Sequence, residues 1–194
     1  TLSFDKRRRS FFSSQLFTLL ELVEQNLIDP NTLYGSWAGA YGNFQFMPST
    51  INNYAIDYDG NNKIELKASL KDSLASAANY INKIGWKKKE PCYKKITIKD
   101  NIPIKYLNTS AKKIHHKKKF KKLKKYIEKY ESLNINDRQT IAIITPDKDI
   151  IPEAKNLKPA YIIFDNYELI LKWNRSLRFA LAVCNLKEKF ENEF

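Results

Sequence analysis

The sequence predicts an α+β protein in which helices dominate and short strands lie in the second half of the chain. Apolar residues recur at helical spacing over 8–26 and 69–84. Two runs of β-branched and aromatic residues, 140–144 and 161–164, are bounded by prolines and are typical of strands. With 194 residues and 43% hydrophobic content, the chain is long enough to bury a core.

The first half of the chain is predicted to contain three helices. Residues 8–26 carry apolar side chains on one face, and an Asp-Pro-Asn turn follows them. Pro48 can open a short helix, because a proline at the first helical position loses no hydrogen bond. The clearest pattern is 69–84, where Ser69 stands three residues before Asp72, as in a capping box, and a glycine follows the last turn.

The second half of the chain is predicted to mix strands and helices. Its predicted elements are short strands within 96–107, a lysine-rich amphipathic helix over 111–130, strands at 140–144 and 161–164, a further strand at 167–173 and a helix over 176–190. The change of pattern indicates three segments. They are a helical core over 1–90, an inserted mixed α/β lobe over 91–164 that includes the lysine-rich helix, and a strand and helix over 165–194 that return to the core.

The net charge of +13 is concentrated in one tract, 111–130, which holds ten lysines and one glutamate and so carries +9. A basic surface of this kind suits an anionic polymer, which could be nucleic acid, phospholipid, or the acidic peptide stems and teichoic-type polymers of a cell wall. His115 and His116 are adjacent, so on a helix they would face different ways and make a poor metal pair. No base-reading motif accompanies the tract, and we therefore expect no specific nucleic-acid partner.

The two cysteines are too few for a disulfide framework. Cys184 lies within an apolar helical run, which favours a buried thiol over half of a disulfide with Cys92. No apolar run reaches the roughly 18 residues that span a bilayer, so no transmembrane segment is expected in this chain. Its first residues also lack the charged start and apolar centre of a signal peptide.

Small residues are concentrated in 34–54, which reads YGSWAGAYGNFQFMPSTINNY. Three of the five glycines, Gly35, Gly39 and Gly42, lie here, which indicates positive φ angles or a close backbone approach. Gln45 then stands between two phenylalanines and can both donate and accept hydrogen bonds. Small residues followed by a polar amide between two aromatic rings suit a groove for a flat, hydroxylated ligand. The alternative is a helix crossing that needs small residues.

The run from Gly35 to Ser49 resembles the signature of the lytic murein transglycosylases of the membrane-bound B type. That family typically reads Gly-Ser-x-Ala-Gly-Ala-x-Gly-x-x-Gln-Phe-Met-Pro-Ser, and every fixed position is matched here. The similarity continues through 72–86, is faint over 87–159, and returns at 166–183 with NYELILKWNRSLRFALAV. The resemblance implies a mainly helical, lysozyme-like core with a small β-containing inserted lobe, and peptidoglycan glycan strands as the partner.

The resemblance also implies which side chains line the glycan groove. The implied substrate-binding residues are Arg7, Arg8, Phe11, Ser36, Gln45, Phe46, Tyr80, Trp173 and Asn174. For the two arginines the alternative is an ordinary solvated helix start. For Tyr80 it is a half-buried core tyrosine, and for Asn174 it is a helix cap.

A candidate calcium loop lies within 57–72, where oxygen-bearing side chains alternate along the chain as in known calcium loops. Asn62 stands where such loops usually have glycine, and asparagine tolerates the left-handed conformation. The usual glutamate at the twelfth position is missing, and in the family a later carboxylate replaces it. The implied ligands of a structural Ca²⁺ are Asp57, Asp59, Asn61, the Lys63 carbonyl and Asp72. The alternative is an ordinary surface turn, and no cofactor is expected for catalysis.

The reaction implied by the resemblance is non-hydrolytic cleavage between N-acetylmuramic acid and N-acetylglucosamine, which gives a 1,6-anhydro product. One glutamic acid serves as acid and then base, and the muramyl 6-hydroxyl takes the place of the second carboxylate of most glycosidases. The family carries this glutamate in a Gly-Val-Glu-Thr-like motif, upstream of the position of the arginine pair. No glutamate here matches that motif, so no catalytic residue is assigned in this chain.

The family is usually exported, so a location in the periplasm or cell envelope is implied. We expect both the catalytic acid and an export signal to lie upstream of Thr1. Two alternatives stay open. One is a catalytically inert peptidoglycan-binding protein, and the other is a basic nucleic-acid-binding protein.

Overall fold

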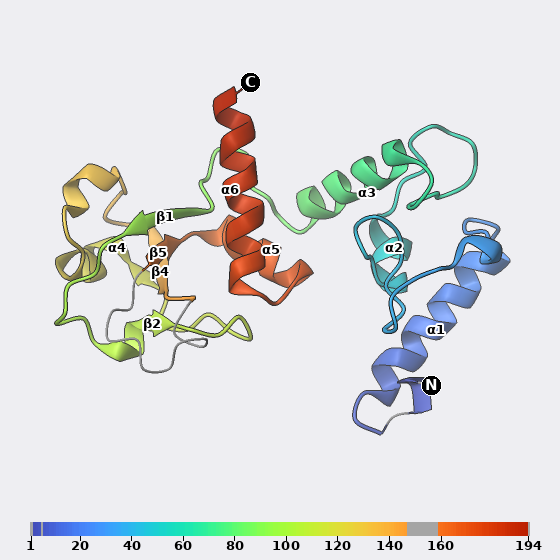
Figure 1. The fold of residues 1–194 in the computed structure, drawn as a ribbon, viewed down its shortest axis with the longest axis horizontal. Coiled ribbons are helices and arrows are strands. Elements are labelled where there is room, and N and C mark those ends of the chain that lie inside the picture. Colours follow the sequence, from blue (N-terminus) through green and yellow to red (C-terminus); the bar gives the residue numbers. More distant parts are fainter. Residues whose placement is uncertain (1, 5, 147–158, 194) are drawn as a thin grey trace. The chain divides into compact units, whose positions relative to one another are not determined.

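The computed structural model describes residues 2–4, 6–146 and 159–193 (Figure 1). Contacts divide the chain into two units, Thr1–Gly85 and Trp86–Phe194. Helices dominate the described residues, and the strands belong to the second unit, so the predicted α+β class is confirmed. The sequence predicts a boundary at residue 90 and a separate segment over 165–194, whereas the structure groups that segment with the lobe. Its return to the helical core stays a prediction.

The first unit is helical, and its elements agree with the predicted helices. They are the turn η1 (Leu2–Phe4), α1 (Arg9–Glu24), the turn η2 (Pro30–Thr32), α2 (Pro48–Tyr54) and α3 (Leu70–Lys83). The predicted end signals of α3 are confirmed. The Ser69 hydroxyl accepts a hydrogen bond from the Asp72 backbone N–H at 3.2 Å, and Gly85 has a φ of +106° just after the helix.

A buried glutamine joins α1 to α2. Gln15 is only 7% exposed, and its Oε1 accepts a hydrogen bond from the Ser49 backbone N–H at 3.0 Å. The first N–H groups of a helix have no partner within the helix, so this bond caps α2 with a side chain from another element. Leu22 and Ile51 are buried in the apolar core of the same unit. This role of Gln15 was not predicted from the sequence.

The second unit is built on a sheet with strand order β1-β5-β4-β2, and β3 pairs with β4. The strands are β1 (Tyr93–Ile96), β2 (Leu107–Asn108), β3 (Lys118–Lys119), β4 (Thr140–Ile144) and β5 (Ala160–Ile163). Strand β5 runs antiparallel to β1 and β4, and β2 runs parallel to β4. The isoleucines of β4 and β5 are buried in the core, which confirms both predicted strands.

The lysine-rich tract does not form the continuous helix that the sequence predicts. The tract contains β3, α4 (Phe120–Leu123) and η4 (Lys124–Tyr126). The turn η3 (Ile104–Tyr106) precedes it, and η5 (Tyr130–Leu133) begins at its last residue. The apolar residues Phe120, Leu123 and Ile127 are buried as expected. Like charges one turn apart disfavour a long helix, and the pairing of β3 with β4 supplies backbone hydrogen bonds instead.

Two helices, α5 (Asp165–Trp173) and α6 (Leu177–Glu193), make up most of residues 165–193. The predicted strand at 167–173 is therefore wrong, because a short apolar run fits a buried helix as well as a strand. Asn166, buried in the first turn of α5, accepts from the Lys87 N–H and donates to the Lys87 and Glu90 carbonyls. None of the described helices is both long enough and apolar enough to cross a membrane.

Cys92 and Cys184 form a disulfide, which corrects the expectation of a free thiol. Both residues are buried, and their Cα atoms lie 5.8 Å apart. Cys92 directly precedes β1 and Cys184 lies within α6, so the bond ties that helix to the edge of the sheet. The predicted burial of Cys184 is confirmed, but sequence spacing could not reveal its pairing.

Candidate functional site

The glycine-rich segment forms a tight turn, which explains its small residues. The Ser36 N–H donates to the Ala40 carbonyl at 2.8 Å, and the Ala40 N–H donates to Ser36 Oγ at 3.1 Å. A Cβ added at Gly35 would lie 2.5 Å from the Ala40 oxygen. Gly42 has a φ of +78°, and a Cβ there would lie 2.6 Å from Leu66 Cβ. The segment therefore needs glycine for close backbone approach rather than for a helix crossing.

Gln45 lies at the tip of a short hairpin. Tyr41 and Phe46 exchange two backbone hydrogen bonds, of 2.8 and 2.9 Å, and Gln45 between them has a φ of +52°. Its Nε2 donates to the Gly42 carbonyl at 2.9 Å. A left-handed residue other than glycine stores about 1–3 kcal/mol of strain, and such residues cluster at functional sites. The exposed amide of Gln45 is thus held in one orientation.

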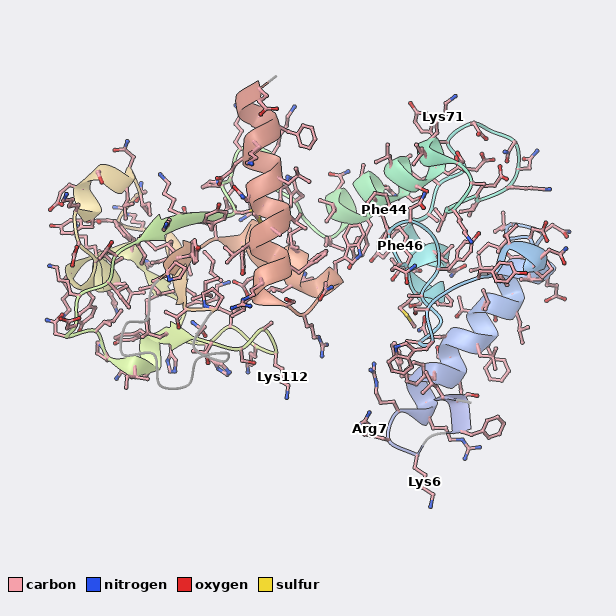
Figure 2. The ribbon with its side chains drawn as sticks, viewed as in Figure 1. Lys6, Arg7, Phe44, Phe46, Lys71 and Lys112 are labelled. Atoms are coloured by element: carbon pink, nitrogen blue, oxygen red, sulfur yellow. A yellow bond between two sulfur atoms is a disulfide. The ribbon has the colours of Figure 1, made fainter. Side chains whose placement is uncertain are left out.

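An aromatic cluster lies beside this hairpin. The ring centroids of Phe46 and Tyr80 are 5.7 Å apart, Tyr54 lies 5.0 Å from Tyr80, and Phe44 lies 6.4 Å from Phe46. Figure 2 labels Phe44 and Phe46 in the first unit. Phe46 is only 3% exposed and therefore supports the hairpin rather than offering an open ring face. Tyr80 is half-buried. Burial, with a smaller effect from Tyr54, raises its pKa, so its hydroxyl stays protonated and can donate a hydrogen bond.

The beginning of α1 carries the predicted arginine pair. The Arg8 guanidinium lies 4.4 Å from the Phe11 ring centroid, and this cation–π contact orients the charge. Arg7 precedes it and is exposed. A cavity of about 250 Å³ lies between α1 and the glycine-rich turn, and Trp37, 85% exposed, lines it. Trp37 is not among the predicted groove residues, although an exposed tryptophan inside the signature is a signal for a binding surface.

Trp173 and Asn174 lie in the second unit, where α5 ends. The Asn174 N–H donates to the Ile170 carbonyl at 3.0 Å, and Ser176 Oγ accepts from the Phe179 N–H at 3.2 Å. These bonds end α5 and cap α6. Asn174 itself is exposed and Trp173 is half-buried. Since Gln45 belongs to the first unit, a groove shared by Gln45 and Asn174 stays a prediction.

The acidic loop before α3 brings three of the predicted metal ligands together. Asp57, Asp59 and Asp72 each offer a carboxylate oxygen, and these oxygens all lie within 4.8 Å of one another. Asn62 has the expected left-handed backbone, with a φ of +63°. The side chain of Asn61 accepts from the Lys63 N–H at 2.8 Å, which closes a turn within the loop. Carboxylate and carbonyl oxygens are ligands that Ca²⁺ prefers, so these residues fit such an ion.

Asp72 holds the loop to α3. It is completely buried, and its two oxygens accept from the Tyr58 N–H at 2.9 Å and the Glu65 N–H at 3.1 Å. Glu65 in turn accepts from Asn61 Nδ2 at 2.8 Å. Glu65 thus brings to the loop a further carboxylate that is not among the predicted ligands.

Calcium should stabilise the first unit through this loop. For a weak site of the extracellular kind, with a dissociation constant of about 0.1–1 mM, a hundredfold excess of calcium adds about 2.7 kcal/mol to the unfolding free energy. Thermal melts in calcium, in magnesium and in chelator measure this effect. Asp59→Ala should abolish the calcium increment. A melting temperature that calcium leaves unchanged, or raises equally in Asp59→Ala, would remove the ion from the loop.

Comparison with known proteins shows the family and the fold class of this chain. The model of the family described as "Transglycosylase SLT domain" matches residues 1–188, and the chain belongs to this family. The chain is similar to membrane-bound lytic murein transglycosylase B of Escherichia coli K12, with 44% identity over 89 residues. That match covers 45% of this chain and 24% of the relative.

Solved structures of lytic transglycosylases have the same fold. SltB1 from Pseudomonas aeruginosa gives a TM-score of 0.79 at 26% identity, over 100% of this chain and 60% of that one. SltB3 from P. aeruginosa, in complex with NAG-anhNAM-pentapeptide, gives 0.80 at 28% identity, over 98% and 49%. Slt35 from E. coli, in complex with calcium, gives 0.75 at 28% identity, over 97% and 56%. The chain thus spans less than two thirds of each of these relatives.

Proposed function

We propose that this chain binds peptidoglycan glycan strands as part of a lytic transglycosylase. The reaction would cleave the MurNAc–GlcNAc linkage to 1,6-anhydro products. The observation that carries the proposal is Gln45, an exposed amide held in a strained backbone beside Phe46 and Tyr80. N-acetyl sugars offer amide and hydroxyl groups that need fixed partners, and ring faces that favour aromatic neighbours. The peptidoglycan fragment in the SltB3 structure supports this choice of ligand.

The remaining groove residues complete the proposal. Ser36 Oγ accepts from the Ala40 N–H and can still donate its own proton to a sugar oxygen. Arg8, oriented by Phe11, offers a planar set of N–H donors. Arg7, Trp173 and Asn174 are proposed as further contacts to the glycan.

We propose the periplasm or cell envelope as the location. The buried disulfide supports an oxidising compartment, because disulfides are rare in reducing cytosol. The E. coli relative is described as membrane-bound, and that description is consistent with an envelope location. The candidate calcium loop fits this environment too, as weak calcium sites are common in extracellular modules.

This 194-residue chain should release no 1,6-anhydro muropeptides from purified sacculi, because no glutamate in it matches the family's catalytic motif. Mass spectrometry of the soluble products checks this, with a complete lytic transglycosylase as the positive control. Release of anhydro products by this chain would show that it contains its own proton donor. Binding to sacculi without release is the expected result.

Removal of the groove amides should weaken binding to muropeptides. Gln45→Ala and Asn174→Ala should each cost about 1–3 kcal/mol where the lost amide leaves a buried partner unpaired. Calorimetric titration with a soluble disaccharide-peptide measures the affinity. Gln25→Ala is the matched control, because it removes an exposed amide at the end of α1. Unchanged affinity in both groove variants would contradict the assignment and leave the glycine-rich turn as a purely structural device.

A further inference from the structure

Two basic concavities lie on either side of the loop that follows β2. The first, of about 520 Å³, is lined by three lysines and two imidazoles, together with backbone and hydroxyl groups of the loop. These basic side chains are Lys105, Lys112, Lys113, His115 and His116. All five lie within the second unit, so the geometry of this concavity depends on that unit alone.

The second concavity, of about 330 Å³, shares three residues of the loop with the first. Thr109, Ser110 and Lys112 line both concavities, and Arg175 adds a guanidinium group to the lining of the second. Within the described part of the chain, neither lining includes an aspartate or a glutamate. Positive charges gathered in a concave surface reinforce one another's potential and favour an anionic ligand.

Other lysines of the same tract have carboxylate partners. Lys117 pairs with Asp165 and Glu168, and Lys124 pairs with Asp137 at 2.8 Å. Those ion pairs neutralise the charge of Lys117 and Lys124. The linings around the β2 loop bring several cations together with the hydroxyl groups of Thr109 and Ser110.

The loop between the two concavities is held in place by a buried amide. Asn108 is 6% exposed, and its Nδ2 donates to the His115 and Ile143 carbonyls at 3.1 and 3.0 Å. Its Oδ1 accepts from the His115 N–H at 2.7 Å. These bonds fix both ends of the loop against β4. A wall that is already ordered loses less conformational entropy when a ligand binds.

Two backbone features accompany the basic side chains of the two concavities. His116, at the rim of the first concavity, has a left-handed backbone with a φ of +53°, a strained conformation of the kind found at functional sites. Ser176 and Leu177, at the beginning of α6, line the second concavity. The N–H groups of a helix start carry partial positive charge, which here adds to the side-chain cations.

We propose that the two concavities together bind a ligand that carries two or more phosphate groups, with one group on each side of the Thr109–Lys112 loop. Phosphate oxygens accept several hydrogen bonds at once. Arginine forks, lysine ammonium groups and serine or threonine hydroxyls are the donors that recognise them. The site lies outside the proposed glycan groove residues, and its test does not depend on glycan binding.

The test is a calorimetric titration of the full chain with short linear polyphosphate. Lys112→Gln/Lys113→Gln should weaken binding about tenfold or more, because charge-assisted hydrogen bonds are lost. Lys121→Gln/Lys122→Gln removes the same charge from exposed positions outside both linings, and should change affinity less than about twofold. Inorganic phosphate should bind far more weakly than the polymer, because it can fill only one concavity.

Three results would overturn the proposal. The first is equal weakening in the two double variants, which would show attraction by net charge alone. The second is binding of polyglutamate of matched charge as tightly as polyphosphate, which would exclude phosphate recognition. The third is tighter binding of single-stranded oligonucleotides that is lost in Tyr106→Ala or Tyr126→Ala, which would identify a nucleic-acid surface. Arg175→Gln provides a second variant on the opposite side of the loop and should also weaken polyphosphate binding.

Discussion

Loss of the disulfide between Cys92 and Cys184 should lower the unfolding free energy of the second unit by about 2–5 kcal/mol. The bond joins residues separated by 92 positions, and cross-links that close long loops remove the most entropy from the unfolded chain. Both cysteines are buried, so the bond also fixes the packing of α6 on the sheet. Urea unfolding followed by circular dichroism, with and without reductant, measures the loss.

The matched controls separate the bond from the side chains. Cys92→Ala/Cys184→Ala should unfold at the same lowered urea concentration as the reduced chain, and reductant should not change its midpoint. Cys184→Ala alone should behave like the double variant, because one cysteine cannot form the cross-link. If the oxidised and reduced chains unfold together, the disulfide contributes nothing to stability.

Asp72→Ala should destabilise the first unit by about 2–5 kcal/mol even in calcium-free buffer. The change leaves the Tyr58 and Glu65 N–H groups, whose bonds to Asp72 are partly buried, without their acceptors. An unsatisfied donor that is shielded from water costs about 1–3 kcal/mol. Asp72→Asn should also destabilise the unit, because an amide keeps one acceptor oxygen and turns a donor toward the second N–H. Chemical unfolding in the presence of chelator gives both values.

Asp59→Ala is the control for the structural role of the loop. Asp59 is exposed, so without calcium its removal should change stability by less than about 0.5 kcal/mol. With calcium, the same variant should lose the increment that the ion gives to the unmodified chain. Equal destabilisation by Asp59→Ala and Asp72→Ala in chelator would show that the buried hydrogen bonds of Asp72 are not what holds the loop.

Features that depend on local backbone preferences could be predicted from the sequence. Helices α1, α2 and α3 lie where the apolar spacing, Pro48 and the Ser69 cap predict them. Gly42 and Asn62 have the positive φ angles that their residue types tolerate. The concentration of glycines in 34–54 also indicated unusual backbone in that window, but the left-handed conformation of Gln45 itself was not predicted. Such preferences act over a few residues, so they can be read along the chain.

Features that depend on partners distant in the sequence could not be predicted, because they form only in the tertiary structure. The lysine-rich tract pairs with β4 instead of forming one helix, and 167–173 becomes a helix tied by Asn166 to Lys87. The buried amides Gln15 and Asn108 bond to backbone groups 34 and 35 positions away. Cys184 finds its partner only when α6 packs beside the start of β1. Burial gives these contacts their energy, and burial depends on which elements meet in space rather than on the order of residues along the chain.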